Sequence, residues 1–402
     1  MKTLIELYVN EQFDDLAAAM TFRPERTVFL SGGFVPDKAT REGMIRFIRK
    51  ACGNTEAEVK FIDIGSRSLG SLFQKIGEVV KRYGDCCIDM TGGPTGALIA
   101  AHRYCKRNGT KAFFFDSRRG KFINIHGMAE EISSHPPEPL TVERAIAMGG
   151  GLVTGSGHSA SPYEKDRETA NAVLDIYARN LSVWNAFSEY LQYACRHYYD
   201  SRTQLFTAPS TLLNNSMLLY ANKRLLNELL RAGAIRELAT DGESISFRFA
   251  NGFMKDLLTT VGMCLELLIY VSALESGRFD DVRMSVVFDW DGVLHGNFND
   301  TTNELDVVMT KGLSSVFVSC KSARPDTRDL YEIDYLARRF GGRDANVVLA
   351  TAVPLSKENW ATYMRARDMG IIVVERADLE KGREAVAEKL VEPTWLDEKP
   401  KA

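Results

Sequence analysis

The first 125 residues alternate short apolar segments with amphipathic helical patterns, and this alternation restricts the fold more than any other feature of the chain. Apolar segments such as Thr27–Leu30 and Cys86–Met90 alternate with helical patterns such as Ser68–Tyr83 and Gly96–Asn108. Strands separated by helices form parallel sheets with right-handed crossovers. We therefore predict an N-terminal α/β domain, residues 1–130, built on a doubly wound parallel sheet.

Two further regions follow a change in composition. Ser133–Leu140 contains three prolines and Gly149–Gly157 contains five glycines, which indicates a boundary. At roughly 150 residues per domain, a chain of 402 residues holds two or three domains. Helical patterns and then a hairpin predict a linker and a helical, winged-helix-like connector over residues 131–250; a connector with no nucleic-acid role is the simpler alternative. Residues 251–402 combine strands and helices and predict a second α/β domain.

Composition excludes several classes of protein. Hydrophobic residues make up 45% and charged residues 26%, so a mainly disordered chain is excluded. A net charge of −3 excludes a generally basic nucleic-acid coat but allows a local basic groove. The seven cysteines include no Cys-x-x-Cys and indicate reduced thiols in a cytoplasmic protein. The apolar run Leu257–Leu274 carries Glu266 near its middle, which favours a buried helix over a membrane span, and no membrane association is expected.

Small residues follow three of the predicted strands. Ser31-Gly32-Gly33, Gly65-Ser66 and Asp89-Met-Thr-Gly-Gly-Pro-Thr-Gly96 fall at the same edge of a parallel sheet. Glycine turns let backbone N–H groups approach a ligand, and the helix after the third loop favours an anion. These loops indicate a phosphate-bearing or nucleotide ligand; a simple tight turn is the alternative. Neither Gly-x-x-x-x-Gly-Lys-Ser/Thr nor Gly-x-Gly-x-x-Gly occurs here.

The N-terminal segments resemble a CARF domain, the Rossmann-like sensor of CRISPR ancillary nucleases. The resemblance lies in Thr3-Leu-Ile-Glu-Leu-Tyr, in Phe22-Arg-Pro-Glu-Arg-Thr-Val-Phe-Leu and in Asp89-Met-Thr-Gly-Gly. It implies a homodimer whose shared pocket binds cyclic tetra-adenylate. Where the family pattern continues with Thr-Lys, this chain has Pro94-Thr95-Gly96 and lacks the lysine. The implied ligand contacts are Ser31, Gly32, Gly33, Ser66, Thr91, Gly92, Gly93 and Thr95.

Carboxylates and a lysine gather on three C-terminal elements. Glu266 is the one charged residue between Asp256 and Glu275, and a buried carboxylate needs a cation or a hydrogen-bond donor. Glu304 and Asp306 share one face of a strand because side chains alternate, and such a pair suits a hard divalent cation. A short turn leads to the next strand, which ends at Lys321, a residue able to stabilise negative charge on a phosphate.

These residues together resemble the PD-(D/E)XK nuclease site of a restriction-endonuclease-like α/β domain. The resemblance implies Mn²⁺ or Mg²⁺ bound by Asp306, by Glu266 and by the main-chain carbonyl of Cys320, with Lys321 positioning the attacking water. The family pattern expects an acid where this chain has Ser319. Glu332 or Asp334 on the following helix could supply that carboxylate, with Glu332 preferred; alternatively Glu304 does, or metal binding is weaker.

The two resemblances imply a metal-dependent endonuclease activated by cyclic tetra-adenylate. Its expected substrates are single-stranded DNA and RNA, with nicking of plasmid DNA, in type III CRISPR antiviral defence. We expect the substrate to approach a local basic cluster formed by Lys321, Arg324, Arg328, Arg338, Arg339 and Arg343.

Two other functions remain open from the sequence. Residues 209–250 could bind DNA in a ligand-responsive regulator whose nuclease domain is degenerate, an alternative that Ser319 keeps open. Val286-Val-Phe-Asp289-Trp-Asp291-Gly-Val-Leu also matches the first motif of haloacid-dehalogenase-type phosphatases, in which the first aspartate is the nucleophile. Too little chain follows for that fold, so a strand end and a turn are the better interpretation of Asp289.

Overall fold

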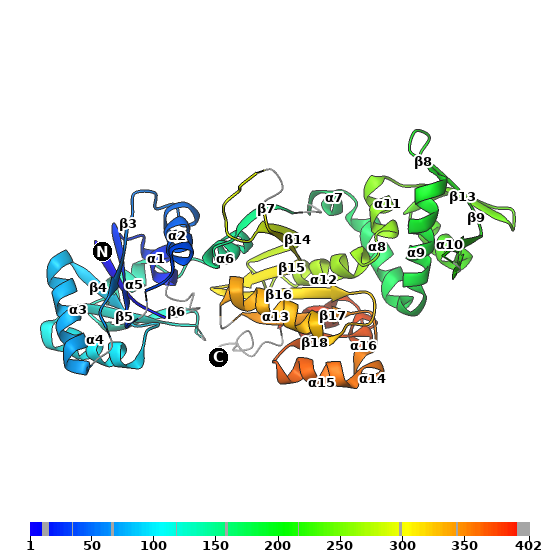
Figure 1. Cartoon of the computed structure of the whole chain (residues 1–402). Helices are drawn as coiled ribbons and strands as arrows, with labels where there is room; N and C mark the ends of the chain where they lie inside the picture. Colours follow the sequence, from blue (N-terminus) through cyan, green and yellow to red (C-terminus); the bar gives the residue numbers. More distant parts are fainter. Residues whose placement is uncertain are drawn as a thin grey trace.

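The computed structural model describes residues 1–9, 16–33, 35–65, 68–117, 119–156, 160–215, 217–296, 300–342 and 345–391. The described chain forms three regions in a row (Figure 1). An N-terminal domain lies at one end, a C-terminal α/β domain lies in the middle, and a helical module, residues 160–259, lies at the far end. The helical module is therefore not interposed between the two α/β domains, although its place in the sequence suggests a connector.

The N-terminal domain is built on a six-stranded sheet with the order β3-β2-β1-β4-β5-β6. Strands β1 to β5 are parallel, whereas β6 pairs antiparallel with β5. The predicted doubly wound parallel sheet is confirmed. The order reverses between β1 and β4, so the carboxyl ends of these strands form a topological switch point. The strands are β1 Thr3–Tyr8, β2 Arg26–Ser31, β3 Glu58–Asp63, β4 Cys86–Asp89, β5 Lys111–Asp116 and β6 Lys121–His126.

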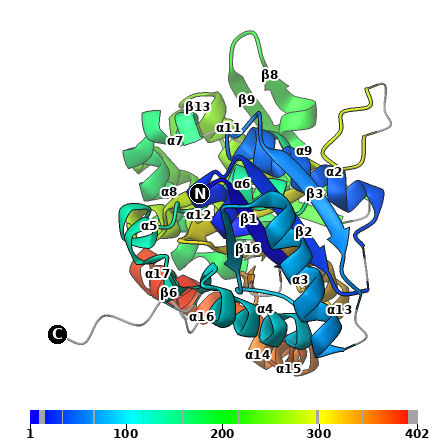
Figure 2. The same cartoon turned by 90° about the vertical axis from the view of Figure 1, so that its left-hand side faces the viewer.

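Helices cover both faces of this sheet because successive strand residues point to opposite sides. Leu4 packs in one cluster with Phe47, and its neighbour Ile5 packs in another with Ile76. α3 and α4 lie side by side on the second face (Figure 2), and Gly109, with φ of 68°, ends α4 where the sequence predicts. The helices are α1 Ala17–Phe22, α2 Lys38–Arg46 and its π-helical continuation η2 Phe47–Ala51, α3 Leu69–Tyr83, α4 Thr95–Asn108 and α5 Ala129–Ser134.

The C-terminal domain contains a second six-stranded sheet, with the order β18-β17-β16-β15-β14-β7. β7, β14, β15 and β16 pair antiparallel in succession, whereas β16, β17 and β18 pair parallel, which is the mixed sheet that the sequence predicts. Because β7 pairs with β14, this sheet recruits a strand from the expected linker. The strands are β7 Leu152–Ser156, β14 Asp281–Asp289, β15 Thr302–Lys311, β16 Ser314–Lys321, β17 Asn346–Thr351 and β18 Ile372–Val374.

Helices also cover both faces of the second sheet. Val318 belongs to the cluster that contains α12, and its neighbour Phe317 belongs to the cluster that contains α13. The capping box of Asp326 and Asp329 fixes the start of α13. The helices are α12 Met263–Glu275, α13 Thr327–Gly341, α14 Leu355–Glu358, α15 Trp360–Asp368, α16 Arg376–Leu379 and α17 Arg383–Val391.

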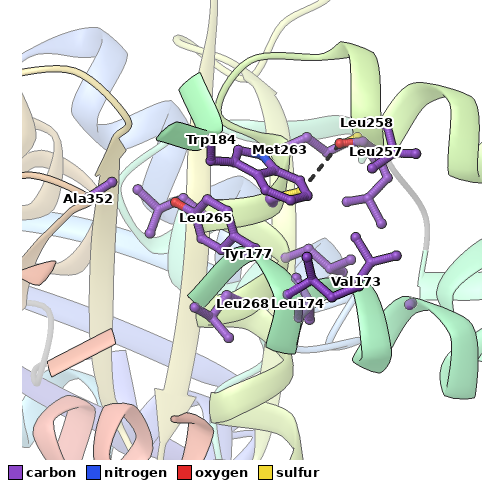
Figure 3. Packing of buried hydrophobic residues seen from close by; sticks show 14 of the residues in the cluster. Val173, Leu174, Tyr177, Trp184, Leu257, Leu258, Met263, Leu265, Leu268 and Ala352 are labelled. Atoms are coloured by element: carbon purple, nitrogen blue, oxygen red, sulfur yellow. Dashed lines mark hydrogen bonds between the residues drawn. The ribbon is translucent and has the colours of Figure 1, made fainter. Parts of the chain in front are cut away.

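α12 is buried in the core that joins the C-terminal domain to the helical module. Figure 3 shows Leu265 and Leu268 of α12 against Tyr177 and Trp184. No single helix of the described ranges is long and apolar enough to cross a membrane. α11 (Gly252–Thr259) and α12 meet the length and composition test as a pair, but they are bent by 111°.

The helical module combines helices with a small sheet of order β12-β13-β9-β8 and a separate hairpin, β10-β11. The turn between β12 and β13 is closed by the Asp241 carboxylate, which accepts the backbone N–H of Ser244. The predicted hairpin is therefore present. The elements are α7 Ala160–Lys165, α8 Arg167–Arg179, α9 Leu181–Tyr198, β8 Tyr199–Asp200, β9 Leu205–Pro209, β10 Thr211–Asn214, β11 Met217–Tyr220, α10 Lys223–Arg231, β12 Ile235–Thr240, β13 Ser244–Phe249 and α11 Gly252–Thr259.

A short helix, α6 (Val142–Met148), joins the two α/β domains. Its Ala145 packs in the core of the N-terminal domain, whereas its Ile146 packs in the C-terminal core with Phe340. A second contact crosses directly, because Arg46 of α2 donates to the carbonyls of Gly150, at 3.3 Å, and Asp291, at 2.5 Å. The two domains therefore meet through α6 and through the segments that flank Gly150 and Asp291.

Candidate functional sites

A solvent-open pocket lies where β15 begins and β16 ends, against the N-terminal half of α13. Its volume is about 350 Å³, part of which is open solvent. It collects four of the five predicted catalytic residues, and Glu266 is not among its lining residues. The lining residues are Glu304, Leu305, Asp306, Val318, Ser319, Lys321, Asp329, Glu332, Ile333 and Leu336.

Strand register explains why Asp306 and Lys321 meet. The turn pairs Lys311 with Ser314, and the pairing continues to Val307 opposite Val318. Beyond this pair, Asp306 Oδ2 accepts the backbone N–H of Cys320 at 2.6 Å. Burial raises the pKa of Asp306 above its usual value, although this hydrogen bond and the charge of Lys321 oppose the shift.

Lys321 is held by a residue that the sequence analysis did not select. Its Nζ lies 3.1 Å from Asp329 Oδ1, and Asp329 Oδ2 accepts the backbone N–H of Asp326. Burial alone lowers the pKa of Lys321, but Asp329, Asp306 and Glu332 outweigh it and the net shift is upward. The lysine is therefore held as a cation. The spacing of Asp326 and Asp329 indicates helix capping, and no sequence pattern indicates the contact with Lys321.

The acids of α13 take different positions. Glu332 lines the pocket, as the preferred choice for the displaced carboxylate requires, and its charge acts on both Asp306 and Lys321. Asp334 instead forms an ion pair with Arg338 at 2.8 Å, one turn along the helix. Of the three residues considered for this carboxylate, Glu332 and Glu304 line the pocket and Asp334 does not.

Glu266 lies in the first turn of α12. Burial and then the charges of Asp306 and Glu304 raise its pKa to about 7. An aliphatic carboxyl normally titrates near 4.3, so at neutral pH this group is partly protonated. The charges of Asp306 and Glu304 therefore act on Glu266, although it does not line the pocket.

The pocket's donor chemistry suits a hard divalent cation, because carboxylate oxygens outnumber Lys321 and repel one another. However, no group of three or more His, Cys, Asp or Glu side chains in the described chain converges as metal ligands do. Asp306 is turned to the N–H of Cys320 instead. The chemical nature of these donors therefore suits a divalent cation, but their oxygen atoms do not converge on one point in this structure.

The phosphatase-like motif forms a turn, as expected. Asp289 ends β14, which pairs antiparallel with both neighbours, rather than opening a parallel doubly wound sheet. Its carboxylate accepts the backbone N–H of Val293 at 3.1 Å. Asp291 contacts His295 Nε2 at 3.1 Å on the same exposed loop. Asp289 is thus used within the turn, which argues against a phosphatase nucleophile.

The predicted ligand loops meet at the switch point of the N-terminal sheet. A Cβ on Gly32 would lie 3.3 Å from Pro94 and 3.8 Å from the carbonyl of Gly65, so the three loops are adjacent. Asp63 ties two of them together, because its Oδ1 accepts the backbone N–H groups of Gly33 and Gly65, both at 2.8 Å.

Several of the predicted contacts have distinct local roles. Thr91 donates its hydroxyl to Asp89 and accepts the N–H of Phe115, which fixes the start of the Gly92-Gly93 turn. Thr95 begins α4, whose N-cap is Pro94 and has no side-chain cap, so the first N–H groups of the helix face the loop. The buried hydroxyl of Ser31 has no hydrogen-bond partner among the described residues. Ser66, and Arg343 of the predicted basic cluster, lie outside the described residues.

Comparisons with known proteins agree with this division of the chain. Residues 255–392 match the family of Card1-like endonuclease domains. The fold of the whole chain is similar to VC1899 from Vibrio cholerae, with a TM-score of 0.72 and 15% identity, covering 96% of this chain and 97% of that one. It is also similar to Can2 from Sulfobacillus thermosulfidooxidans in complex with cyclic tetra-adenylate, with a TM-score of 0.66 and 17% identity, covering 98% and 97%. No curated protein matches.

These matches confirm the resemblance inferred from the sequence. The endonuclease family covers β14 to α17 and so contains the pocket between β15, β16 and α13. The solved structures cover nearly the whole chain and confirm the α/β fold class, with its parallel N-terminal sheet. The C-terminal domain is accordingly called the endonuclease-like domain below.

Proposed function

We propose that this chain is a nuclease whose endonuclease-like domain is activated when the N-terminal domain binds a cyclic oligoadenylate, with cyclic tetra-adenylate as the activator. One observation carries the proposal: the chain combines an endonuclease-family domain with a pocket of carboxylates and a held lysine, Lys321. The solved Can2 structure holds cyclic tetra-adenylate and shares the fold of both domains, which supports the choice of activator. The setting is type III CRISPR defence in the cytoplasm.

The chain's own residues divide the work at the pocket. Lys321, held by Asp329, stabilises negative charge that develops on the scissile phosphate and orients the attacking water. Glu332 and Glu304 line the pocket and are placed to accept the proton of that water. Mn²⁺ or Mg²⁺, bound by Asp306, Glu266 and the carbonyl of Cys320, would lower the pKa of a bound water and neutralise phosphate charge.

The activator would occupy the switch point of the N-terminal sheet. Backbone N–H groups at Gly32, Gly92 and Gly93 and the uncapped start of α4 offer donors to phosphate, and Ser31 offers a buried hydroxyl. We propose that two copies of the chain share the ligand as a homodimer. Activation then requires that the ligand binds two arrangements of the domains with different affinity, and α6 is the element placed to transmit the difference.

The test is cleavage of plasmid DNA, single-stranded DNA and RNA by the purified chain in Mn²⁺, with and without cyclic tetra-adenylate. We expect nicked plasmid and shortened single strands with the activator and little product without it. Equal cleavage in both conditions would refute activation. No cleavage of any substrate in either Mn²⁺ or Mg²⁺ would refute the nuclease itself.

A second candidate is a ligand-responsive nucleic-acid-binding regulator. Ser319 at the position of the family's acid favours it, together with the absence of a converged ligand set among the described residues. In that case residues 209–250 bind DNA without metal. Metal-independent retention of one DNA sequence, without cutting, distinguishes this function from the first.

A further inference from the structure

The outer face of α13 carries an exposed row of tyrosines and arginines directly beside the nuclease pocket. Tyr331 is 51% exposed and Tyr335 is 60% exposed, although tyrosine rings are usually covered by a packing partner. They lie four residues apart, so they share one face of the helix. The row, called the α13 outer face, consists of Arg324 in the preceding loop and of Arg328, Tyr331, Tyr335 and Arg338.

The pocket and the α13 outer face meet along one helix. Glu332, which lines the pocket, precedes Tyr335 by three residues, a spacing that brings Cβ atoms to about 5–6 Å. Leu336, the residue after Tyr335, also lines the pocket. A chain leaving the pocket on this side therefore passes Tyr335 within one turn of the helix.

Tyr335 is held in place by a second aromatic ring. Trp290 stacks on it with centroids 5.9 Å apart and planes at 17°. Trp290 is itself fixed by an edge contact with the buried Phe340, at 5.1 Å, and by the hydrogen bond from its backbone N–H to the carbonyl of Thr301. The exposed side of Tyr335 is thus a preorganised planar surface, which lowers the entropy cost of stacking a further ring on it.

The arginines give this surface a charge opposite to that of a phosphate backbone. The side chain of Arg328 is 91% exposed and that of Arg338 is 62% exposed. Their partners, Asp326 and Asp334, form surface ion pairs, which are worth little and allow the guanidinium groups to exchange partners. Alternating aromatic and cationic groups along a surface are the arrangement that single-stranded nucleic acids require.

We propose that the α13 outer face binds the single strand that leads from the nuclease pocket, with bases stacked on Tyr335 and Tyr331 and phosphates contacted by Arg328 and Arg338. This inference rests on the proposed nuclease function and names the surface and the side chains that would bind its single-stranded substrate. A duplex hides the faces of its bases within the stack, so it gains the arginine contacts and loses the aromatic ones.

The first experiment measures binding without cutting. The full chain, in excess EDTA, is titrated against a fluorescein-labelled single-stranded oligonucleotide of mixed sequence and against the same strand in a duplex. We expect Tyr335→Ala and Tyr331→Ala each to weaken single-strand binding by about fivefold or more, since base stacking is worth about 1–3 kcal/mol. Duplex binding should change little. Tyr335→Phe and Tyr331→Phe keep the ring and should bind as the unsubstituted chain does.

Two controls make the result specific. Tyr198 on α9, in the helical module and outside residues 209–250, is 40% exposed, so Tyr198→Ala removes another exposed tyrosine and should leave single-strand affinity unchanged. An oligonucleotide with abasic sites offers no rings to stack, so the Ala variants and the unsubstituted chain should bind it equally. Unchanged binding by both Ala variants, or loss in the Phe variants, would overturn the proposal, as would an equal loss in Tyr198→Ala.

Cleavage then separates this proposal from the nuclease function. With Mn²⁺ and activator, the Ala variants should raise KM for single strands and leave kcat nearly unchanged. If the chain cuts single strands and the Ala variants have an unchanged KM, the role proposed for the α13 outer face is refuted, while the nuclease function is supported. If the chain never cuts but single-strand binding depends on the rings of Tyr331 and Tyr335, the nuclease function is refuted, while binding at the α13 outer face is supported.

Discussion

Each of the two six-stranded sheets carries a candidate site at its strand ends, but the two sites consist of different chemical groups. The N-terminal site consists of glycine turns, hydroxyls and the start of α4. The carboxylate of Asp63 at this site accepts hydrogen bonds from the backbone N–H groups of Gly33 and Gly65. The C-terminal site concentrates carboxylates around Lys321 in a pocket open to solvent. The first arrangement suits recognition of an anion by backbone groups, and the second suits charge-driven chemistry.

This difference determines how each site should respond to substitution. A site made of backbone donors depends on the path of the chain, so it should be sensitive to added bulk and insensitive to loss of charge. A site made of charged side chains should show the reverse. Substitutions at the two sites and at the contact between the domains test this contrast.

The largest effect is expected from the charged groups of the endonuclease-like domain. Asp306→Asn and Lys321→Ala should each lower the rate of plasmid cleavage by at least about 100-fold. The first removes the carboxylate proposed to bind the metal, and the second removes the cation proposed to stabilise the phosphate. Binding of cyclic tetra-adenylate, measured by calorimetry, should not change.

Lys311→Ala is the matched control. Lys311 lies at the turn of the β15–β16 hairpin, at the end away from the pocket, and forms an ion pair with Asp280 at 3.2 Å. Full activity of either pocket variant would contradict the site assignment. Loss of activity in Lys311→Ala would indicate a general effect on the hairpin instead.

The next effect is on stability and concerns Glu266. Its folded pKa of about 7 lies above the value in an unfolded chain, so the folded state binds the proton more tightly. Stability of the metal-free protein should therefore fall as pH rises from about 4.5 to about 7. Glu266→Gln should raise the free energy of unfolding above pH 7 by at most about 3 kcal/mol and change little near pH 4.

Chemical denaturation in EDTA at both pH values tests this expectation. Glu388→Gln, at an exposed position of α17, should leave stability unchanged at either pH. A destabilised Glu266→Gln at pH 8 would show that the carboxylate is compensated within the protein, contrary to its raised pKa.

A smaller effect is expected from added bulk in the N-terminal site. Gly93 has φ of 119°, and a Cβ there would lie 2.6 Å from Leu7 Cβ. Gly93→Ala should cost about 2 kcal/mol or more in backbone strain and displace the ligand loop, which should weaken cyclic tetra-adenylate binding by at least about tenfold. Basal cleavage in Mn²⁺ should remain.

Gly53→Ala is the control for backbone strain alone. Gly53 has φ of 67°, and a Cβ there would meet nothing within 4 Å. Its substitution should lower the melting temperature of the N-terminal domain slightly and leave ligand affinity intact. Equal loss of affinity in both variants would remove the evidence for a site at Gly93.

The sequence predicted most of the fold because both sheets have clear periodic patterns. Strands such as Cys86–Met90 and helices such as Gly96–Asn108 lie within a residue of their observed bounds. It could not predict that Leu152–Ser156 would join the C-terminal sheet, because edge pairing depends on a partner, β14, more than 100 residues away. A glycine-rich composition indicates a boundary and contains no information about such a partner.

The candidate pocket was partly accessible from the sequence for a similar reason. Asp306 and Lys321 flank a short turn, so local strand register brings them together. The role of Asp329 could not be predicted, because its contact with Lys321 depends on how α13 packs against β16. Glu266 stood out by its isolation in an apolar helix, which is a signal of burial.

The smallest effect is expected at the contact between the two domains, which would link the two sites if the proposed activation occurs. Arg46 of α2 donates to the carbonyls of Gly150 and Asp291, and the chain at Gly292 is so close that a Cβ there would meet Arg46 and the Gly150 carbonyl. Arg46→Ala removes charge-assisted hydrogen bonds worth about 1 kcal/mol while leaving both sites intact. We expect activation by cyclic tetra-adenylate to fall about fivefold, with unchanged ligand affinity and unchanged basal cleavage.

Arg49→Ala is the matched control, because Arg49 donates to the Ala57 carbonyl inside the N-terminal domain, and it should retain full activation. If Arg46→Ala is activated as fully as Arg49→Ala, communication between the two sheets does not depend on this contact and runs through α6 instead.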